Sequence, residues 1–135
     1  MTQFTPTFKN GQAALLTGIR HYHLYTDAAT GIPHQWLRFN ELRQSSNPTL
    51  SSVSFGVVCG SDADGFEYMC AVETPSFDSF NVGDGRLKLL PQHYLVLIHE
   101  GNISSIKETW QAIWRWLPTT AYKIAHKPVF ERYDE

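Results

Sequence analysis

The closing part of the chain decides the fold. It begins with the stretch LPQHYLVLIHEGNI, Leu90–Ile103. The apolar run within this stretch predicts a strand, and the glycine that follows the run predicts a turn. The run Ser104–Leu117 has apolar residues at helical spacing, and PVFERY over Pro128–Tyr133 predicts a last strand. One acid, Glu131, lies inside this last strand. Because burying an acid costs several kcal/mol without compensation, the sequence raises the question of what compensates it.

The first half of the chain predicts elements in a similar order. Ala13–Tyr25 predicts a strand, in which β-branched and aromatic residues are frequent. A helix follows, with Thr30 as its cap, Pro33 in its first turn and an end near Gln44. Further strands are predicted at Val53–Cys59, Phe66–Thr74, Leu87–Leu90 and Tyr94–His99.

The two predicted helices share an apolar pattern at a constant offset of 74 residues. The second helix adds a capping-box candidate, Ser105 with Glu108. The pattern indicates one domain, residues 1–135, built from pseudo-repeats at about 13–74 and 87–133. Two strand-helix-strand-strand units side by side predict an α+β fold: a curved antiparallel sheet with two helices on one face and a cleft between the halves. The matching positions are Ile32, Trp36, Phe39 and Leu42 with Ile106, Trp110, Ile113 and Trp116.

Composition limits the function. The 135 residues are 42% hydrophobic and 18% charged, which is typical of a soluble globular domain. The net charge of −2 and the absence of a basic stripe argue against direct nucleic-acid binding. Neither a signal segment nor a membrane-length apolar run is present, so we expect a cytoplasmic protein that does not bind membranes. Aromatic residues reach 13%, and rings in excess of core needs also line ligand pockets.

Residues with metal-binding or redox chemistry have simpler explanations. Cys59 and Cys70 lie in apolar strands and are expected to be buried free thiols, although a disulfide between neighbouring strands stays open. His21 and His23 share a strand face, but no third ligand has matching spacing. We therefore expect no metal and no cofactor.

Several motifs point to one family when taken in order. They are Tyr94–Gly101, Ile106–Trp110, Trp116–Pro118 and Val129–Tyr133, with Ile32–Phe39, Phe55–Gly56 and Phe66–Tyr68 in the first half. Together they resemble the GyrI-like small-molecule-binding family, the effector-binding domain of some AraC-type (Rob-type) and MerR-type transcriptional activators. The resemblance covers about residues 13–133. It implies a duplicated fold with a concave cleft, where multidrug-responsive members hold lipophilic, often cationic compounds against aromatic walls and a buried acid.

The resemblance implies site residues. Glu131 matches the acid, and Trp36, Tyr68 and Trp110 match characteristic aromatic positions. Two structural explanations remain open: an ion pair of Glu131 with Arg132, Arg20 or Lys127, and core packing of the tryptophans. The expected ligand-binding residues are Glu131, Trp36, Phe39, Phe55, Tyr68, His99, Trp110 and Tyr133.

The chain has no room for a helix-turn-helix module, so it resembles the standalone members. These include the gyrase-inhibitor protein and enzymes that hydrolyse cyclopropane-containing compounds. We expect non-catalytic binding of lipophilic, cationic or planar small molecules, for effector sensing or sequestration. One alternative is a hydrolase that uses Glu131 as general base. Another is an inhibitor of a protein target such as DNA gyrase, which leaves a protein partner open.

Overall fold

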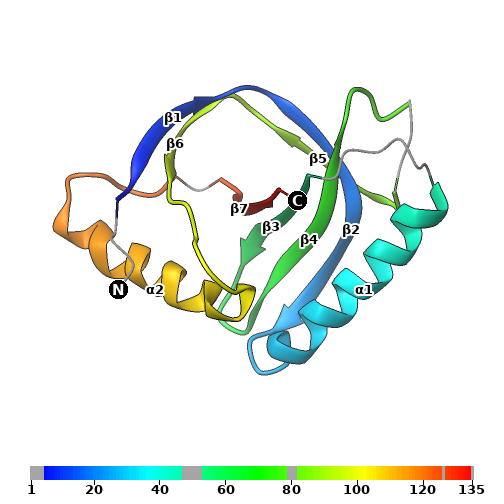
Figure 1. The fold of residues 1–135 in the computed structure, drawn as a ribbon, viewed down its shortest axis with the longest axis horizontal. Helices are drawn as coiled ribbons and strands as arrows, with labels where there is room; N and C mark the ends of the chain where they lie inside the picture. Colours follow the sequence, from blue (N-terminus) through cyan, green and yellow to red (C-terminus); the bar gives the residue numbers. More distant parts are fainter. Residues whose placement is uncertain (1–4, 47–52, 79–81, 126, 135) are drawn as a thin grey trace. The chain divides into compact units, whose positions relative to one another are not determined.

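The structure, a computed structural model, describes residues 5–46, 53–78, 82–125 and 127–134 (Figure 1). Contacts divide the chain into two compact units, Met1–Gln12 with Pro91–His126 and Ala13–Leu90 with Lys127–Glu135. Neither helix of the described residues is both long and apolar enough to cross a membrane. The elements are β1 (Thr7–Gly11), β2 (Ala14–Leu24), α1 (Ala28–Ser46), β3 (Ser54–Ser61), β4 (Gly65–Thr74), β5 (Gly85–Leu89), β6 (Gln92–Val96), α2 (Ile106–Trp116) and β7 (Val129–Tyr133).

The larger unit is a curved antiparallel sheet with one helix. Its strand order is β5-β2-β4-β3-β7, and α1 runs along β2 and β4 (Figure 1). The strand at the end of the chain, β7, pairs with β3, so that Gly56 lies opposite Glu131. The predicted α+β class and antiparallel sheet are confirmed.

Helix α1 forms around the predicted apolar stripe. Phe39 is fully buried, and Ile32, Trp36 and Leu42 pack against the same cluster. The predicted start at Thr30 was wrong, because the helix begins at Ala28. The Asp27 carbonyl accepts hydrogen bonds from the first turn, and Pro33 therefore lies one turn further inside the helix than expected.

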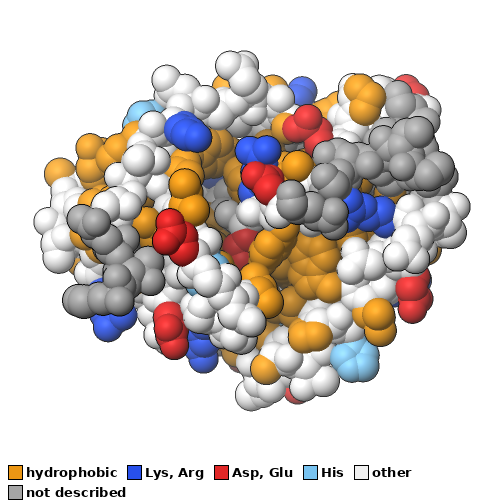
Figure 2. All heavy atoms as spheres, viewed as in Figure 1, with side chains coloured by type: hydrophobic (Ala, Val, Ile, Leu, Met, Phe, Trp, Pro, Cys, Tyr) orange, Lys and Arg blue, Asp and Glu red, His pale blue; other side chains and the backbone are white. Residues whose placement is uncertain are grey.

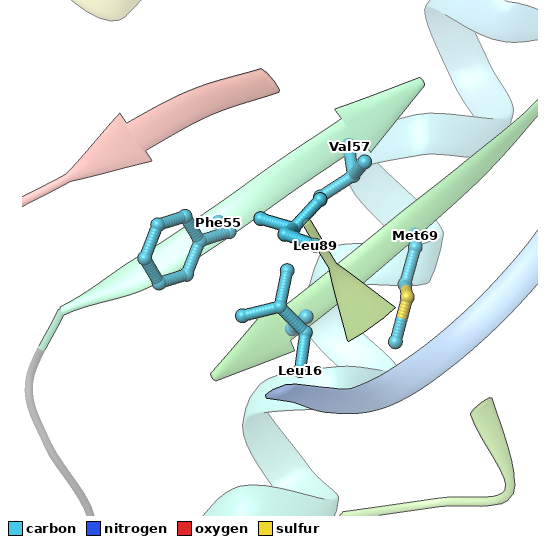
Figure 3. Close-up of a cluster of buried hydrophobic side chains, with 6 residues drawn as sticks. Leu16, Phe55, Val57, Met69 and Leu89 are labelled. Atoms are coloured by element: carbon cyan, nitrogen blue, oxygen red, sulfur yellow. The ribbon is translucent and has the colours of Figure 1, made fainter. Parts of the chain in front are cut away.

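Both faces of the large sheet are apolar. Hydrophobic side chains gather over β3 and β4 on the face seen in Figure 2. Tyr68, Cys70 and Val72 point toward α1 and belong to its cluster. The alternate residues form a second cluster, with α1 behind the strands in Figure 3: Leu16, Phe55, Val57, Met69, Ala71 and Leu89. Each such side chain contributes roughly 1.5–3 kcal/mol when fully buried.

The smaller unit contains β1 and β6, which pair antiparallel, and α2. Pro91 separates β5 from β6 because it has no N–H for a strand ladder, so the strands divide into a five-stranded and a two-stranded sheet. The capping box was wrong: Ser105 makes no side-chain cap, and Asn102 instead caps a 3₁₀ turn before α2. Helices on one face and a cleft between the halves stay predictions.

Candidate functional site

Glu131 lies on the α1-facing side of β7 and is half-buried. The hydroxyl group of Tyr133, two residues along the same strand face, donates a hydrogen bond to its Oε1 atom. This bond fixes the direction of the carboxylate, since a charge-assisted hydrogen bond is stronger than a neutral one.

Gly56 makes room for a second tyrosine at this carboxylate. A Cβ atom at Gly56 would lie 2.0 Å from the hydroxyl oxygen of Tyr68 and 3.4 Å from Oε1 of Glu131. The missing side chain therefore lets the Tyr68 ring, from β4, cross over β3 toward β7. Sequence analysis did not assign Gly56 to the site, although a glycine inside a strand often marks such a close approach.

Trp36 completes the arrangement from α1. Its Nε1–H donates a hydrogen bond to the Tyr68 hydroxyl oxygen at 3.1 Å. Its ring packs edge to face against the Tyr133 ring, with the two centroids 5.6 Å apart. We call the set Trp36, Gly56, Tyr68, Glu131 and Tyr133 the aromatic site. It brings four of the eight predicted binding residues together within the larger unit.

Both tyrosine hydroxyls of the aromatic site stay protonated at neutral pH. Burial raises the pKa of Tyr68, and the nearby Glu131 raises it further. Burial also raises the pKa of Tyr133, with its hydrogen bond to Glu131 as the next cause. The tyrosines therefore contribute neutral rings and hydroxyl donors. An acid among such rings has the chemistry that receives an organic cation.

Two predicted residues lie near the aromatic site without facing it. Phe39 is fully buried, and its ring packs edge to face against the Trp36 ring with the two centroids 5.7 Å apart. It therefore supports Trp36 from the core side. Phe55 points to the opposite sheet face, where it packs against Phe130 at 5.7 Å. Strand alternation explains this, because Phe55 and Gly56 are neighbours in sequence.

His99 and Trp110 belong to the smaller unit. His99 links the segment before α2 to the helix: its Nδ1 lies 2.6 Å from Oγ1 of Thr109 and its Nε2 lies 3.0 Å from the Asn102 carbonyl. Trp110 stacks on Trp114 at 6.0 Å. The binding role of His99 and Trp110 stays a prediction.

Two of the three cations considered as structural partners of Glu131 pair with other acids. Arg20 forms an ion pair with Glu67, and Arg132 forms one with Asp134, in which Nε lies 3.1 Å from Oδ1. Both cysteines are free thiols, as expected, and burial raises the pKa of each.

The comparison with protein families gives a match over nearly the whole chain. Residues 11–135 match the family Cass2, described as "integron-associated effector binding protein". No curated protein sequence gives a significant match.

Solved structures share the fold at low sequence identity. An integron cassette protein from the mobile metagenome of Vibrio cholerae has a TM-score of 0.76 at 17% identity, covering 98% of this chain and 90% of that one. The protein SAV2435, solved bound to tetraphenylphosphonium, has a TM-score of 0.73 at 18% identity, covering 99% and 84%. A further protein, from Staphylococcus aureus MU50, has a TM-score of 0.73 at 17% identity, covering 98% of this chain and 88% of that one.

Proposed function

Because the chain belongs to the Cass2 family of integron-associated effector binding proteins, we propose that it binds lipophilic organic cations without chemical turnover. The ligand lies in the aromatic site, with Glu131 as the counter-charge. Planar, weakly charged compounds are weaker ligands of the same site. Sensing or sequestration of such effectors is the resulting function.

The observation that carries this proposal is one carboxylate held among three rings. Tyr133 orients Glu131, Gly56 admits Tyr68, and Trp36 holds the Tyr68 hydroxyl. A cation over the face of a ring gains about 0.5–2 kcal/mol per contact, and the carboxylate adds direct charge pairing. SAV2435, which shares the fold, was solved with a lipophilic cation of this class, and this supports the choice of ligand.

The test measures affinity for tetraphenylphosphonium by isothermal titration calorimetry, with tetraphenylborate as a probe of the same shape and opposite charge. The variant Glu131→Gln keeps the size of the side chain and removes its charge. We expect its affinity for the cation to fall at least about tenfold, because the phosphonium donates no hydrogen bond and the attraction between opposite charges ~6 Å apart near a protein surface is about 3 kcal/mol.

The matched control is Glu73→Gln, the same substitution at an exposed acid of β4. It should leave the affinity unchanged, since long-range charge effects are screened by salt. Equal affinity of parent and Glu131→Gln for the cation would remove Glu131 from the site. Equal affinity of the parent for both probes would remove charge selection altogether.

One observation also bears on the hydrolase alternative. The Tyr133 hydroxyl donates to the Glu131 carboxylate, so a proton donor and a candidate general base lie side by side. An enzyme would consume a cyclopropane-containing electrophile and lose turnover, with binding retained, in Glu131→Gln. Inhibition of a protein target such as DNA gyrase stays a prediction.

A further inference from the structure

We propose that Tyr133 sets the class of cation that the aromatic site takes: quaternary cations, whose charged centre carries only carbon substituents, bind in preference to amines that carry N–H groups. This preference rests on the proposed function, because it concerns the ligand of the same site. It follows from the hydrogen bonds that Glu131 and its neighbours make within the protein, and from the rings that surround them.

The Glu131 carboxylate accepts a hydrogen bond before any ligand arrives. The Tyr133 hydroxyl group donates it to Oε1, from a position two residues along the same strand face. Both residues belong to β7, so one short strand holds the donor and the acceptor together. A hydroxyl donor removes none of the negative charge of a carboxylate, yet it takes up part of the capacity of the carboxylate to accept further hydrogen bonds.

The Tyr68 hydroxyl oxygen is another acceptor beside Glu131, and it is also in use. It accepts a hydrogen bond from Nε1–H of Trp36 at 3.1 Å, and Tyr68 is buried. A Cβ atom at Gly56 would lie 2.0 Å from this oxygen and 3.4 Å from Oε1 of Glu131, so the two acceptors converge on one place. A ligand that reaches this place therefore meets oxygens that protein donors have already engaged.

Two kinds of cation respond differently to such a site. An ammonium group with three N–H donors needs three acceptors, and each donor that stays unmet after it leaves water lowers the affinity. A quaternary centre has no N–H group, so it leaves no donor unmet and gains from charge and ring faces alone. The rings of the aromatic site supply these faces at steep angles: Trp36 lies at 69° to the Tyr68 ring and at 89° to the Tyr133 ring.

The residues that make the choice are accessible. Glu131, Tyr133 and Trp36 are each partly exposed, whereas Tyr68 belongs to the core. A ligand can thus reach the carboxylate and two of the rings while the core side chains stay in place. The selection between the two kinds of cation is therefore made at Glu131 and Tyr133.

The test compares two probes with the same ring and the same single positive charge at pH 7, naphthylmethylammonium and its trimethyl derivative. Isothermal titration calorimetry gives the dissociation constant of each probe for the parent and for Tyr133→Phe, which removes only the hydroxyl group. We expect the parent to bind the trimethyl probe at least about tenfold more tightly. In Tyr133→Phe this ratio should fall at least about fivefold, because the freed carboxylate oxygen can accept from the N–H probe.

The matched control is Tyr22→Phe. Tyr22 donates the same type of bond, from its hydroxyl group to Oδ1 of Asp62 at 2.8 Å, and neither residue belongs to the aromatic site. The ratio in this variant should equal that of the parent. The additional methyl groups favour the trimethyl probe in every variant alike, so the change in the ratio reports on Tyr133. Thermal unfolding followed by circular dichroism checks that each variant is folded at the temperature of the titration.

Tetraphenylphosphonium, titrated in the same series, separates this preference from the proposed function. A parent that fails to bind tetraphenylphosphonium would overturn both. A parent that binds it, but whose ratio between the two naphthyl probes is unchanged in Tyr133→Phe, would leave the proposed function standing and overturn the role of Tyr133. Binding of the N–H probe to the parent at least as tightly as the trimethyl probe would overturn that role without any variant.

Discussion

The two flanks of α1 differ in chemistry although they share one helix and one sheet face. On one flank, Trp36 lies among aromatic rings and beside an acid. On the other flank, the preceding residue Gln35 is hydrogen-bonded to a buried histidine, in a groove that Arg38 also lines. Successive helical residues point about 100° apart, so adjacent positions serve different surroundings. A single helix can thus place two different chemical environments on its two flanks.

Tyr68 connects the two flanks. Its backbone carbonyl accepts from Gln35, and its hydroxyl oxygen accepts from Trp36. Phe39 is fully buried between α1 and the sheet, in the same hydrophobic cluster as Tyr68. The flanks therefore differ in side-chain chemistry and share their support in the core, and the variants below test how far the two are independent.

The largest effect is expected for Phe39→Ala, which removes the common support. Deletion of a fully buried phenylalanine side chain costs about 3–5 kcal/mol, a large part of a typical domain stability. Urea denaturation measures the loss. Since both flanks depend on the helix position, affinity for tetraphenylphosphonium should fall, and the NMR signals of the His23 ring, which is bonded to Gln35 on the other flank, should shift as well. A loss of cation affinity with unchanged His23 signals would show that the flanks are supported separately.

A smaller and one-sided effect is expected for Gly56→Ala. The new Cβ would overlap the Tyr68 hydroxyl at 2.0 Å, so Tyr68 must move away from Trp36 and Glu131. Overpacking of this kind costs about 1–3 kcal/mol. Affinity for the cation should fall, and the NMR signals of the His23 ring, which is bonded to Gln35 on the other flank, should not change.

The control for Gly56→Ala is Gly60→Ala in the same strand, where a Cβ would meet no atom within 4 Å. Its unfolding free energy should stay within about 1 kcal/mol of the parent. Equal destabilisation by the two substitutions would mean that backbone freedom, rather than the Tyr68 contact, explains the glycine.

The smallest effect is expected at alkaline pH. The folded-state pKa values of Tyr68 and Tyr133 are raised, so the unfolded chain releases their protons first, above about pH 10. The stability that these groups contribute is complete below that pH and is lost as the pH rises further. The variant with Tyr68→Phe and Tyr133→Phe should lose stability less steeply than the parent in urea denaturation at pH 10–11.5. If the stability of parent and variant fell with the same slope over this pH range, both hydroxyls would be exposed to water in the folded protein.

Patterns that depend on local spacing were predictable. The stripe from Ile32 to Leu42 identified the buried face of α1, and the apolar run Phe66–Thr74 identified the strand β4. The acid in the last strand was singled out because an acid between apolar residues has a cost that only a partner offsets. These inferences use neighbours in sequence, which the chain itself specifies.

The features that could not be predicted depend on contacts between distant strands. The role of Gly56 follows from its place between Tyr68 of β4 and Glu131 of β7. The direction of Phe55 depends on which face of β3 meets α1, and the order of strands decides this. His23 was assigned only a metal alternative, because its bond to Gln35 joins β2 to a helix face.

The pairing of β7 with β3 has a consequence for synthesis. The ribosome completes α1 and the four strands β2 to β5 well before β7 emerges. A nascent chain at that stage already carries Trp36, Gly56 and Tyr68, and it lacks the acid and the last ring. Glu131 and Tyr133 therefore join the aromatic site only after the other strands of this sheet have been made. Removal of β7 would take both residues away from Trp36, Gly56 and Tyr68 and leave β3 as the edge strand.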